Sequence, residues 1–211
     1  MTKIALVAGG DVSGLDWAFD LYVGIDGGAM YLFKQGLPLD LAIGDFDSVS
    51  AEDLSHLRQA AKELIKVPRE KDDTDTELAV KTIFKRYPKA HVTLFGALGG
   101  RLDHLLGNIF LPSHPTIAPF MEQLTICDCQ NKITFLPGGQ QTLSPDNRMA
   151  YIAFLVEGGS GFLEIKGAKY ELTKDVIVDR RFYASNEFIQ QPIVIKTDGD
   201  YVMVIESEDR R

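Results

Sequence analysis

The stretch Ala42-Ile43-Gly44-Asp45-Phe46-Asp47-Ser48-Val49 decides how the whole chain is interpreted. It continues an apolar run, residues 39–43, that is typical of a buried strand. Two carboxylates follow, and alternate residues of an extended segment point the same way, so we expect Asp45 and Asp47 to face one space. Like charges held so close favour a bound cation, and carboxylate oxygens suit Mg²⁺ better than zinc. For an isolated pair, a solvated acidic turn is the alternative.

Composition narrows the class of protein. The chain has 211 residues, of which 45% are hydrophobic, so it can form one large domain or two modest ones. Its net charge of -8 argues against a nucleic acid or an anionic membrane as partner. We expect no signal peptide, because Met1-Thr2-Lys3 leads directly into a strand pattern. With no apolar run of transmembrane length, and with Cys127 and Cys129 interpreted as thiols, we expect a cytoplasmic protein.

Strand and helix patterns alternate through the first part of the chain, which predicts a mostly parallel sheet with right-handed crossovers. The expected strands are residues 3–7, 21–25, 39–43, 63–67 and 91–95. The expected helices follow Asp26-Gly27-Gly28, the capping boxes at Ser50 and Thr74, and Asp103. In the last helix we expect a buried side made of Leu102, Leu105, Leu106 and Ile109. The first crossover, residues 11–20, is short, and its Trp17 is expected in the core.

Unusual polar residues follow four of these strands. They are Asp26-Gly27-Gly28, the Asp45 and Asp47 pair, residues 69–75 and residues 96–104. In such sheets ligands bind beyond the carboxyl ends of the strands. We therefore expect four loops to share one mouth that is rich in Asp, Gly, Arg and Lys.

The pattern changes from about residue 124, where helical periodicity ends. Residues 124–127 and 133–136 predict one hairpin, and residues 193–196 and 201–205 predict another around Thr197-Asp198-Gly199-Asp200. Gly138-Gly139 and residues 158–161 predict turns. We predict an α/β plus all-β fold: an N-terminal Rossmann-like, mostly parallel α/β/α domain over residues 1–128, then a small β-sandwich over residues 129–211.

The residues allow phosphate chemistry without the common nucleotide motifs, since neither G-x-x-x-x-G-K-[ST] nor G-x-G-x-x-G occurs. Gly27-Gly28 and Gly99-Gly100 each precede a helix, where backbone N–H groups can approach an anion, although ordinary turns would look the same. Asp45, Asp47 and Asp75 are candidate Mg²⁺ ligands. Arg69, Lys71 and Arg101 are candidate phosphate contacts.

Asp103 has three open interpretations. It can orient Arg101, it can accept a proton from an attacking hydroxyl, or it can simply be a favourable charge in the first turn of a helix. The neighbouring His104 is either a donor to substrate or an exposed helix residue.

Four motifs in order resemble the thiamin pyrophosphokinase family. They are Asp26-Gly27-Gly28-Ala29, Gly44-Asp45-Phe46-Asp47-Ser48, residues 71–77 and residues 96–104. Gly167-Ala168-Lys169-Tyr170 and Ser185-Asn186-Glu187 look like the thiamin-side motifs of that family. The resemblance therefore covers nearly the whole chain.

The resemblance implies Mg²⁺-dependent transfer of diphosphate from ATP to the hydroxyethyl group of thiamin, with AMP leaving. It implies a homodimer whose site combines the α/β domain of one subunit with the β domain of its partner. Carried onto this sequence, the catalytic residues are Asp45, Asp47, Asp75, Arg101 and Asp103, of which the first three hold Mg²⁺. The ATP and phosphate contacts are Asp26, Gly27, Gly28, Arg69, Lys71, Asp72, Gly99, Gly100 and His104. The thiamin contacts are Tyr170, Ser185 and Asn186.

This sequence departs from the family in its short first crossover and in Tyr170, where some relatives carry Trp; tyrosine still offers a flat ring. Other functions remain open. One is a diphosphokinase acting on another hydroxymethyl heterocycle such as a pterin, which leaves Tyr170 and Ser185-Asn186 unexplained. A second is a Mg²⁺-dependent phosphohydrolase, which usually wants more histidine or a second metal shell. A non-catalytic thiamin-binding module is a third.

Overall fold

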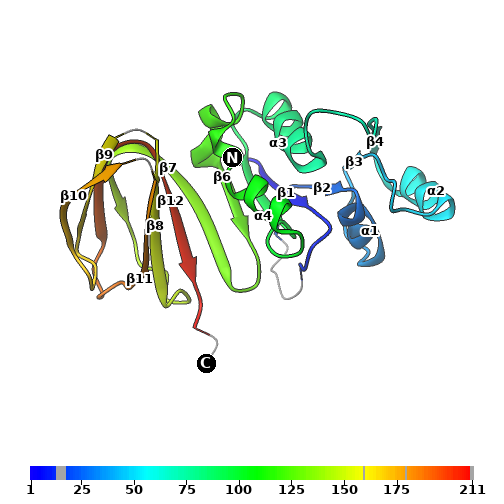
Figure 1. Cartoon of the computed structure of the whole chain (residues 1–211). Coiled ribbons are helices and arrows are strands. Elements are labelled where there is room, and N and C mark those ends of the chain that lie inside the picture. The colour runs from blue at the N-terminus through cyan, green and yellow to red at the C-terminus, as the bar shows by residue number, and fades with distance from the viewer. Residues whose placement is uncertain (13–17, 159, 179, 210–211) are drawn as a thin grey trace. The chain divides into compact units, whose positions relative to one another are not determined.

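The computed structural model (Figure 1) describes residues 1–12, 18–158, 160–178 and 180–209. The core position expected for Trp17 lies outside this part of the chain. The protein forms two compact units, Met1–Cys129 and Gln130–Arg211, and each is described by itself. Among the helices in the described ranges, none has the length and apolarity that a membrane crossing requires.

The first unit is built on a parallel sheet, as the alternation of patterns predicts. Its strands are β1 (Lys3–Val7), β2 (Leu21–Ile25), β3 (Leu41–Gly44), β4 (Glu63–Lys66), β5 (His91–Phe95) and β6 (Leu124–Cys127). They lie in the order β4-β3-β2-β1-β5-β6, and every one of these pairings is parallel. The chain builds outward from β1 to one edge and then returns to β5 on the other side of β1. Such a switch in direction leaves a crevice at the carboxyl ends of the strands.

The sequence did not predict the parallel partner of residues 124–127. These residues pair in parallel with β5, from Val92↔Leu124 to Phe95↔Cys127, so β6 belongs to the sheet of the first unit. Leu124 and Ile126 are buried there. A short alternating pattern indicates a strand, but it carries no information about which strand lies beside it.

The helices of the first unit are α1 (Gly27–Lys34), α2 (Ala51–Ala60), α3 (Asp75–Arg86) and α4 (Leu102–Ile109), followed by the 3₁₀ turns η1 (Leu111–Ser113) and η2 (Ala118–Gln123). Both predicted caps form. Ser50 Oγ accepts the Asp53 N–H at 3.0 Å, and Thr74 Oγ1 accepts the Glu77 N–H at 3.2 Å.

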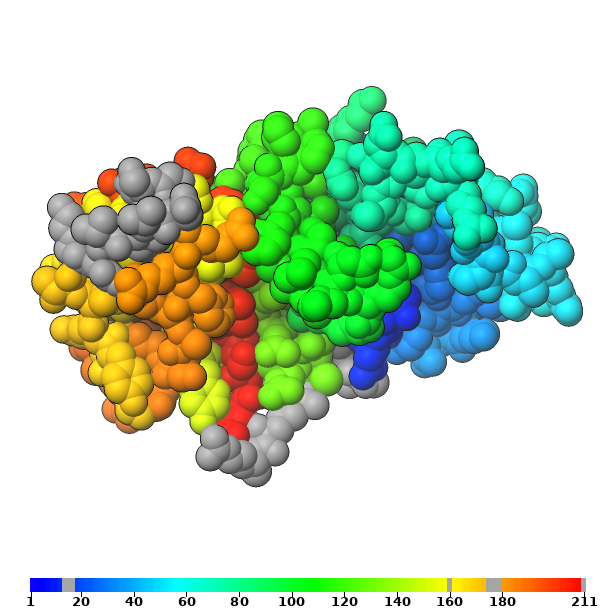
Figure 2. Space-filling view, viewed as in Figure 1, coloured from blue at the N-terminus to red at the C-terminus, as the bar shows by residue number. Residues whose placement is uncertain are grey.

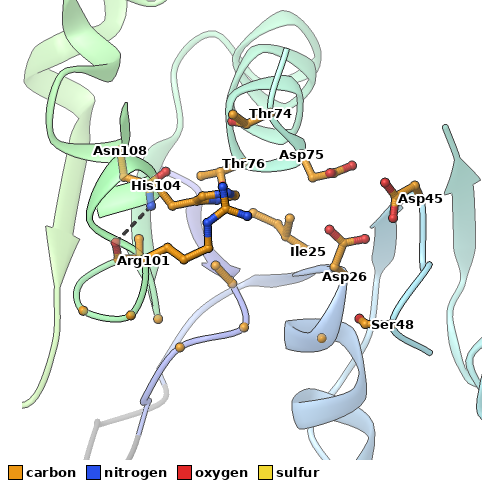
Figure 3. Close-up of a pocket in the computed structure, with 18 of the residues that line it drawn as sticks. Ile25, Asp26, Asp45, Ser48, Thr74, Asp75, Thr76, Arg101, His104 and Asn108 are labelled. Atoms are coloured by element: carbon orange, nitrogen blue, oxygen red, sulfur yellow. Dashed lines mark hydrogen bonds between the residues drawn. The ribbon is translucent and has the colours of Figure 1, made fainter. Parts of the chain in front are cut away.

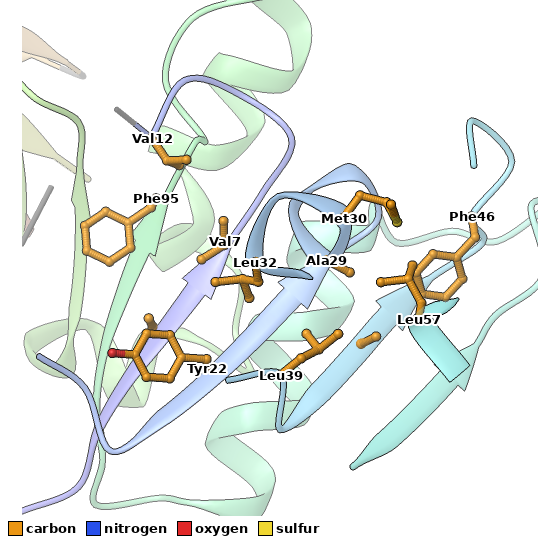
Figure 4. Close-up of a cluster of buried hydrophobic side chains, with 12 residues drawn as sticks. Val7, Val12, Tyr22, Ala29, Met30, Leu32, Leu39, Phe46, Leu57 and Phe95 are labelled. Carbon is orange, nitrogen blue, oxygen red and sulfur yellow. The ribbon is translucent and has the colours of Figure 1, made fainter. Parts of the chain in front are cut away.

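Helices cover both faces of the parallel sheet (Figure 1). On one face α1 and α2 pack against the strands in a buried cluster that includes Ala5, Val7, Ala29, Leu32 and Leu57 (Figure 4). Strand residues that alternate with these face the opposite side, where α3 contacts β2 and β3. The side chains that α3 buries are Ala79, Val80, Ile83 and Phe84.

The prediction for α4 is wrong for half of the expected apolar side: Leu105 and Ile109 are partly buried, but Leu102 and Leu106 are not. Leu102 is 68% exposed and Leu106 is 45% exposed, whereas the polar Asn108 is buried. Periodicity identifies the apolar side of a helix but not what covers it. In the space-filling view the green atoms of this segment form part of the surface of the first unit (Figure 2).

The second unit consists of antiparallel strands. They are β7 (Asn131–Leu143), β8 (Tyr151–Glu157), β9 (Ser160–Lys166), β10 (Leu172–Val178), β11 (Arg181–Asn186) and β12 (Ile193–Ser207). Along one side β12 pairs with β7. Along its other side the first part of β12 pairs with β9 and the second part with β8. β10 and β11 pair with β9 and β8, and the apolar side chains of both groups meet in one buried core.

The hairpin expected at Thr197-Asp198-Gly199-Asp200 is wrong, because β12 continues through these residues as one strand. This is where β12 changes its partner from β9 to β8, with a shift in register. Its turn-forming side chains also bond to a distant strand: Asp198 Oδ1 accepts the Phe162 N–H at 2.6 Å, and Thr197 Oγ1 donates to Phe162 O. The residues therefore make a bend within a strand.

The turn expected at Gly138-Gly139 is also wrong, since β7 continues through both residues. A Cβ on Gly138 would lie 2.2 Å from the Gly199 carbonyl oxygen. The glycines thus allow the bends of β7 and β12 to approach closely.

We predict that Gly28→Ala destabilises the fold far more than Gly27→Ala. A Cβ on Gly28 would lie 1.8 Å from the carbonyl oxygen of Val7 in β1, whereas the nearest atom to a Cβ on Gly27 is Gly9 Cα at 3.8 Å. We expect the free energy of unfolding to fall by about 2 kcal/mol or more for Gly28→Ala. For Gly27→Ala we expect a change within about 0.5 kcal/mol. Urea unfolding followed by circular dichroism measures both, and equal stability of the two variants would contradict this close packing.

Candidate functional site

A cavity of about 850 Å³ opens at the carboxyl ends of β1 to β5, where the sheet changes direction. The loops that were expected to share one mouth all line it. Of the site residues predicted in the first unit, the lining includes Asp26, Gly27, Asp45, Asp47, Arg69, Lys71, Asp75, Gly99, Gly100, Arg101 and His104. Gly28, Asp72 and Asp103 are not part of the lining.

Three carboxylates converge in this cavity (Figure 3). Asp26, Asp45 and Asp75 each offer one oxygen, and these oxygens lie within 4.8 Å of one another. They come from the end of β2, the end of β3 and the first turn of α3. Asp45 and Asp75 were predicted as metal ligands, and Asp26 was predicted as a phosphate contact. Asp47 is not in this group, which we call the carboxylate cluster.

The turn after β3 explains the position of Asp47. Phe46 adopts a left-handed backbone with φ of 56° while its ring is buried in the core, and the Asp47 N–H donates to Asp45 Oδ1 at 3.0 Å. The segment is not extended, so the alternation that placed both carboxylates in one space does not apply here. The Asp47 carboxylate is half exposed and lies 3.5 Å from Arg69 Nε.

The fold fixes both the backbone and the carboxylate of Asp26. Its backbone has φ of 47° and ψ of -117°, and its Oδ1 accepts the Phe46 N–H at 3.1 Å. A side chain on residue 44 could not coexist with it, because a Cβ on Gly44 would lie 1.9 Å from Asp26 Oδ1. Burial raises the pKa of Asp26 to about 6, with the Phe46 hydrogen bond opposing the shift and the charges of Asp75 and Asp45 adding to it. An unusual backbone together with a raised pKa is typical of a functional position.

Lys71 places its ammonium among these carboxylates. Its Nζ lies 3.1 Å from Asp75 Oδ1 and 3.6 Å from Asp45 Oδ2, and it donates to the Pro68 carbonyl oxygen at 3.2 Å. The side chain is only 15% exposed. Burial lowers the pKa of Lys71, but the ion pair with Asp75 and the charges of Asp45 and Asp26 outweigh it and raise the pKa overall. Lys71 is therefore a cation at neutral pH.

The carboxylate cluster fits a divalent metal ion. Its donors are hard oxygens from three separate elements, which is the set that Mg²⁺ prefers. Asp75 Oδ1 is buried and has no hydrogen-bond partner among the described residues, although it forms the ion pair with Lys71. Three carboxylates against one ammonium leave a negative charge for a cation to balance.

Arg101 and Asp103 form a two-point ion pair at the start of α4. Arg101 Nε lies 3.1 Å from Asp103 Oδ1, and Arg101 Nη2 lies 2.6 Å from Asp103 Oδ2. These hydrogen bonds lower the pKa of Asp103 to about 2. A carboxylate with so low a pKa is a poor proton acceptor near pH 7. Of the interpretations left open by the sequence, the geometry favours a residue that orients Arg101, which lines the cavity beside His104 (Figure 3).

The predicted glycines have different local roles. Gly99 and Gly100 have φ of 89° and 69°, in the left-handed region that glycine adopts without strain, and both line the cavity. Gly27 opens α1 at the cavity wall, whereas Gly28 is buried against β1. Asp72 is exposed on the loop before α3.

Several lining residues were missed by the sequence analysis. Gly9 and Gly10 follow β1 just as the predicted loops follow their strands, so their position was a usable signal. Asn108 carried no such signal. It is buried, and its Nδ2 donates to the Ala97 carbonyl oxygen at 2.9 Å, which fixes the loop that carries Gly99 and Gly100 (Figure 3).

In the second unit Asn186 holds Tyr170 as a neighbouring strand would. Asn186 Oδ1 accepts the Tyr170 N–H at 3.0 Å, and Asn186 Nδ2 donates to the Tyr170 carbonyl oxygen at 2.8 Å. Asn186 Oδ1 also accepts the Glu187 N–H at 2.9 Å, and the residue is buried. Tyr170 is 59% exposed, so its ring offers a flat face to solvent. Ser185, beside Asn186, is exposed and has φ of 60°.

Comparison with known proteins covers both units. The family model for the thiamin pyrophosphokinase catalytic domain matches residues 15–119. The model for the thiamin pyrophosphokinase vitamin B1 binding domain matches residues 140–202. The thiamine pyrophosphokinase of Bacillus subtilis (strain 168) is 30% identical over 217 residues, which cover 99% of this chain and 100% of that protein.

Solved structures agree with these matches. A thiamin pyrophosphokinase family protein from Enterococcus faecalis is 38% identical with a TM-score of 0.93, covering 99% of this chain and 100% of that one. The thiamin pyrophosphokinase from Geobacillus thermodenitrificans is 32% identical with a TM-score of 0.78, covering 99% and 98%. Because both domain models match in order and these relatives align with almost the whole chain, the protein belongs to the thiamin pyrophosphokinase family.

Proposed function

We propose that this member of the thiamin pyrophosphokinase family transfers diphosphate from ATP to the hydroxyethyl group of thiamin in a Mg²⁺-dependent reaction that releases AMP. The observation that carries this proposal is the carboxylate cluster at the strand ends of the first unit. A mouth this acidic can hold a polyphosphate only through a cation. Asp45 and Asp75 are the proposed Mg²⁺ ligands, with Asp26 beside them and Asp47 on the same turn as Asp45.

Mg²⁺ held by Asp45 and Asp75 would supply the positive charge that offsets the charge of the phosphates. The chain itself supplies position and further positive charge. Arg101, oriented by Asp103, and the exposed Arg69 can contact phosphate oxygens, and His104 can donate a hydrogen bond. The loop of Gly99 and Gly100 and the N-terminus of α1 can offer backbone N–H groups. Placing donors around a polyphosphate in this way is the main contribution of a protein to phosphoryl transfer.

The fold supports a division of labour between two domains. The strand order β4-β3-β2-β1-β5-β6 with helices on both faces favours a Rossmann-like first domain that binds ATP and Mg²⁺. The pairing of the two parts of β12 with different strands around one core favours a β-sandwich as the second domain, which binds thiamin.

On the thiamin side we propose that Tyr170 stacks on a ring of the substrate and that Ser185 lies beside it. Asn186 acts through Tyr170 rather than through its own amide, because both amide atoms already bond to backbone groups. This would make the backbone position from which the Tyr170 ring projects a property of the folded second unit and not of the ligand.

The proposed assembly is a homodimer in which the first unit of one subunit works with the second unit of its partner. The exposed Leu102 and Leu106 of α4 are apolar side chains that such an interface could cover. A cytoplasmic location remains proposed from the C-x-C spacing of Cys127 and Cys129, which is too constrained for an ordinary disulfide. The net charge of -8 supports small-molecule substrates rather than nucleic acid or a membrane surface.

We predict that Asp45→Asn and Asp75→Asn each remain folded and lose at least about 100-fold in kcat/KM, because each removes a proposed ligand of Mg²⁺. The matched control is Glu70→Gln, an exposed carboxylate on the same loop as Lys71 that does not line the cavity. AMP release from ATP, measured with and without thiamin, reports the reaction. Near-normal turnover in folded Asp75→Asn would remove the metal site from the mechanism.

A second prediction concerns Tyr170. We expect Tyr170→Phe to be mild, because the flat ring is kept, and Tyr170→Ala to raise the KM for thiamin about tenfold with little change in the KM for ATP. Steady-state kinetics with each substrate varied in turn measures both constants. An unchanged KM for thiamin in Tyr170→Ala would move the thiamin site elsewhere.

The shared site predicts recovery of activity from two inactive proteins. Asp75→Asn damages the metal half, and Tyr170→Lys removes the ring and adds a positive charge that repels cationic thiamin. If the site lies across a two-fold interface, each mixed dimer has one doubly damaged site and one intact site. Random exchange makes half the dimers mixed, so roughly a quarter of wild-type activity should return. No recovery, with exchange verified by native mass spectrometry, would place each site within one chain.

A further inference from the structure

The ammonium group of Lys71 contacts three oxygen atoms in and beside the carboxylate cluster. They are Asp75 Oδ1 at 3.1 Å, Asp45 Oδ2 at 3.6 Å and the Pro68 carbonyl oxygen at 3.2 Å. Asp75 is four residues further along the chain, in the first turn of α3, so the lysine and its carboxylate are attached to one short segment. The contacts leave the side chain 15% exposed, unlike that of Arg69 on the same loop, which is 79% exposed.

The ammonium touches the same groups that fit a divalent cation. Asp45 and Asp75 are two of the three members of the carboxylate cluster, and Asp75 Oδ1 has no hydrogen-bond partner in the described ranges. Three carboxylates held within 4.8 Å repel one another, and a positive charge in their midst offsets that repulsion. A dication entering the same space would in turn be repelled by the ammonium.

Lysine is suited to occupy two positions in turn. Its charge is compact and sits on a flexible four-carbon stem, so Nζ can move several ångströms while the backbone stays in place. The cavity that Lys71 lines also contains Arg101 and the loop of Gly99 and Gly100, where the polyphosphate is proposed to bind. An ammonium released from the carboxylates would thus remain within reach of phosphate oxygens.

We propose that Lys71 is a tethered counter-ion: it holds the carboxylate cluster together before substrates bind, and it moves to the phosphates when a divalent cation replaces it. This inference rests on the proposed Mg²⁺ site. It assigns Lys71 two successive partners. In the first state the ammonium competes with the metal ion, and in the second it cooperates with the metal ion in holding the nucleotide.

The first test is Mg²⁺ binding without nucleotide, measured by isothermal titration calorimetry on the full chain. We expect Lys71→Met to bind Mg²⁺ about tenfold more tightly than the wild type, since a competing charge is gone. Lys71→Gln, which keeps a polar side chain but no charge, should also bind Mg²⁺ more tightly. Lys71→Arg keeps the charge, so it should bind Mg²⁺ as weakly as the wild type. Arg69→Met is the matched control: it also removes one positive charge from this loop, but from an exposed position, so affinity should change less than about twofold.

Thermal unfolding gives a readout independent of activity. In EDTA we expect Lys71→Met and Lys71→Gln to unfold at a lower temperature than the wild type, because the carboxylates are left without a cation. Added Mg²⁺ should raise the unfolding temperature of both variants more than that of the wild type. Unchanged or weaker Mg²⁺ binding by both uncharged variants, or equal tightening by Arg69→Met, would overturn the counter-ion role.

The second state is tested with a non-hydrolysable ATP analogue and Mg²⁺ together. In this experiment the wild type should be the tighter binder. We expect Lys71→Met to bind the analogue about tenfold more weakly, because a phosphate contact is lost. Equal binding of the analogue by the two proteins would refute the move to phosphate. Asp75→Asn separates this inference from the proposed function: if it leaves wild-type Mg²⁺ affinity unchanged, the metal site itself is wrong. If it weakens Mg²⁺ binding while the Lys71 variants fail to strengthen it, only the counter-ion role is wrong.

Discussion

Repulsion among three carboxylates in a half-buried mouth is the constraint on which the rest of this site depends. Asp26, Asp45 and Asp75 come within 4.8 Å only because the surrounding chain holds them there. Gly44 has no side chain to displace Asp26, and Thr74 caps the helix whose first turn carries Asp75. The raised pKa of Asp26 records the same constraint, since burial and like charges both oppose its ionisation. This arrangement is the reason for proposing a Mg²⁺ site here, since a bound cation would offset the repulsion.

Close backbone packing provides the rigidity that this arrangement needs. Gly28 lets α1 rest directly on β1, and a Cβ on Gly10 would lie 2.4 Å from the Gly96 carbonyl oxygen, so the loops after β1 and β5 touch at the switch in the sheet. Glycines that look like phosphate-binding signals thus divide into two kinds. Some, such as Gly99 and Gly100, line the cavity, whereas others allow elements to approach closely enough to form it.

In the second unit, side-chain hydrogen bonds hold two irregular parts of the backbone in place. β12 bends once and thereby pairs with β9 before the bend and with β8 after it. Hydrogen bonds of the Asp198 and Thr197 side chains to the Phe162 backbone hold the bend. Asn186 substitutes for a missing strand beside Tyr170 and leaves the tyrosine ring in water. In both places a side chain that would commonly mark a local turn also makes hydrogen bonds to a segment remote in sequence.

The sequence by itself determined what local rules govern: the strands of the parallel sheet, the helices capped by Ser50 and Thr74, and the gathering of polar loops at one edge, because strand direction places all carboxyl ends together. It also determined the family, through four motifs in order. Only the tertiary structure decided which carboxylates converge, because the path of the chain at Phe46 follows from burial of its ring. The sequence pattern also could not show which side of α4 is exposed, which strand pairs in parallel with β6, or that β12 continues as one strand. Each depends on which segment lies opposite, and periodicity describes one segment alone.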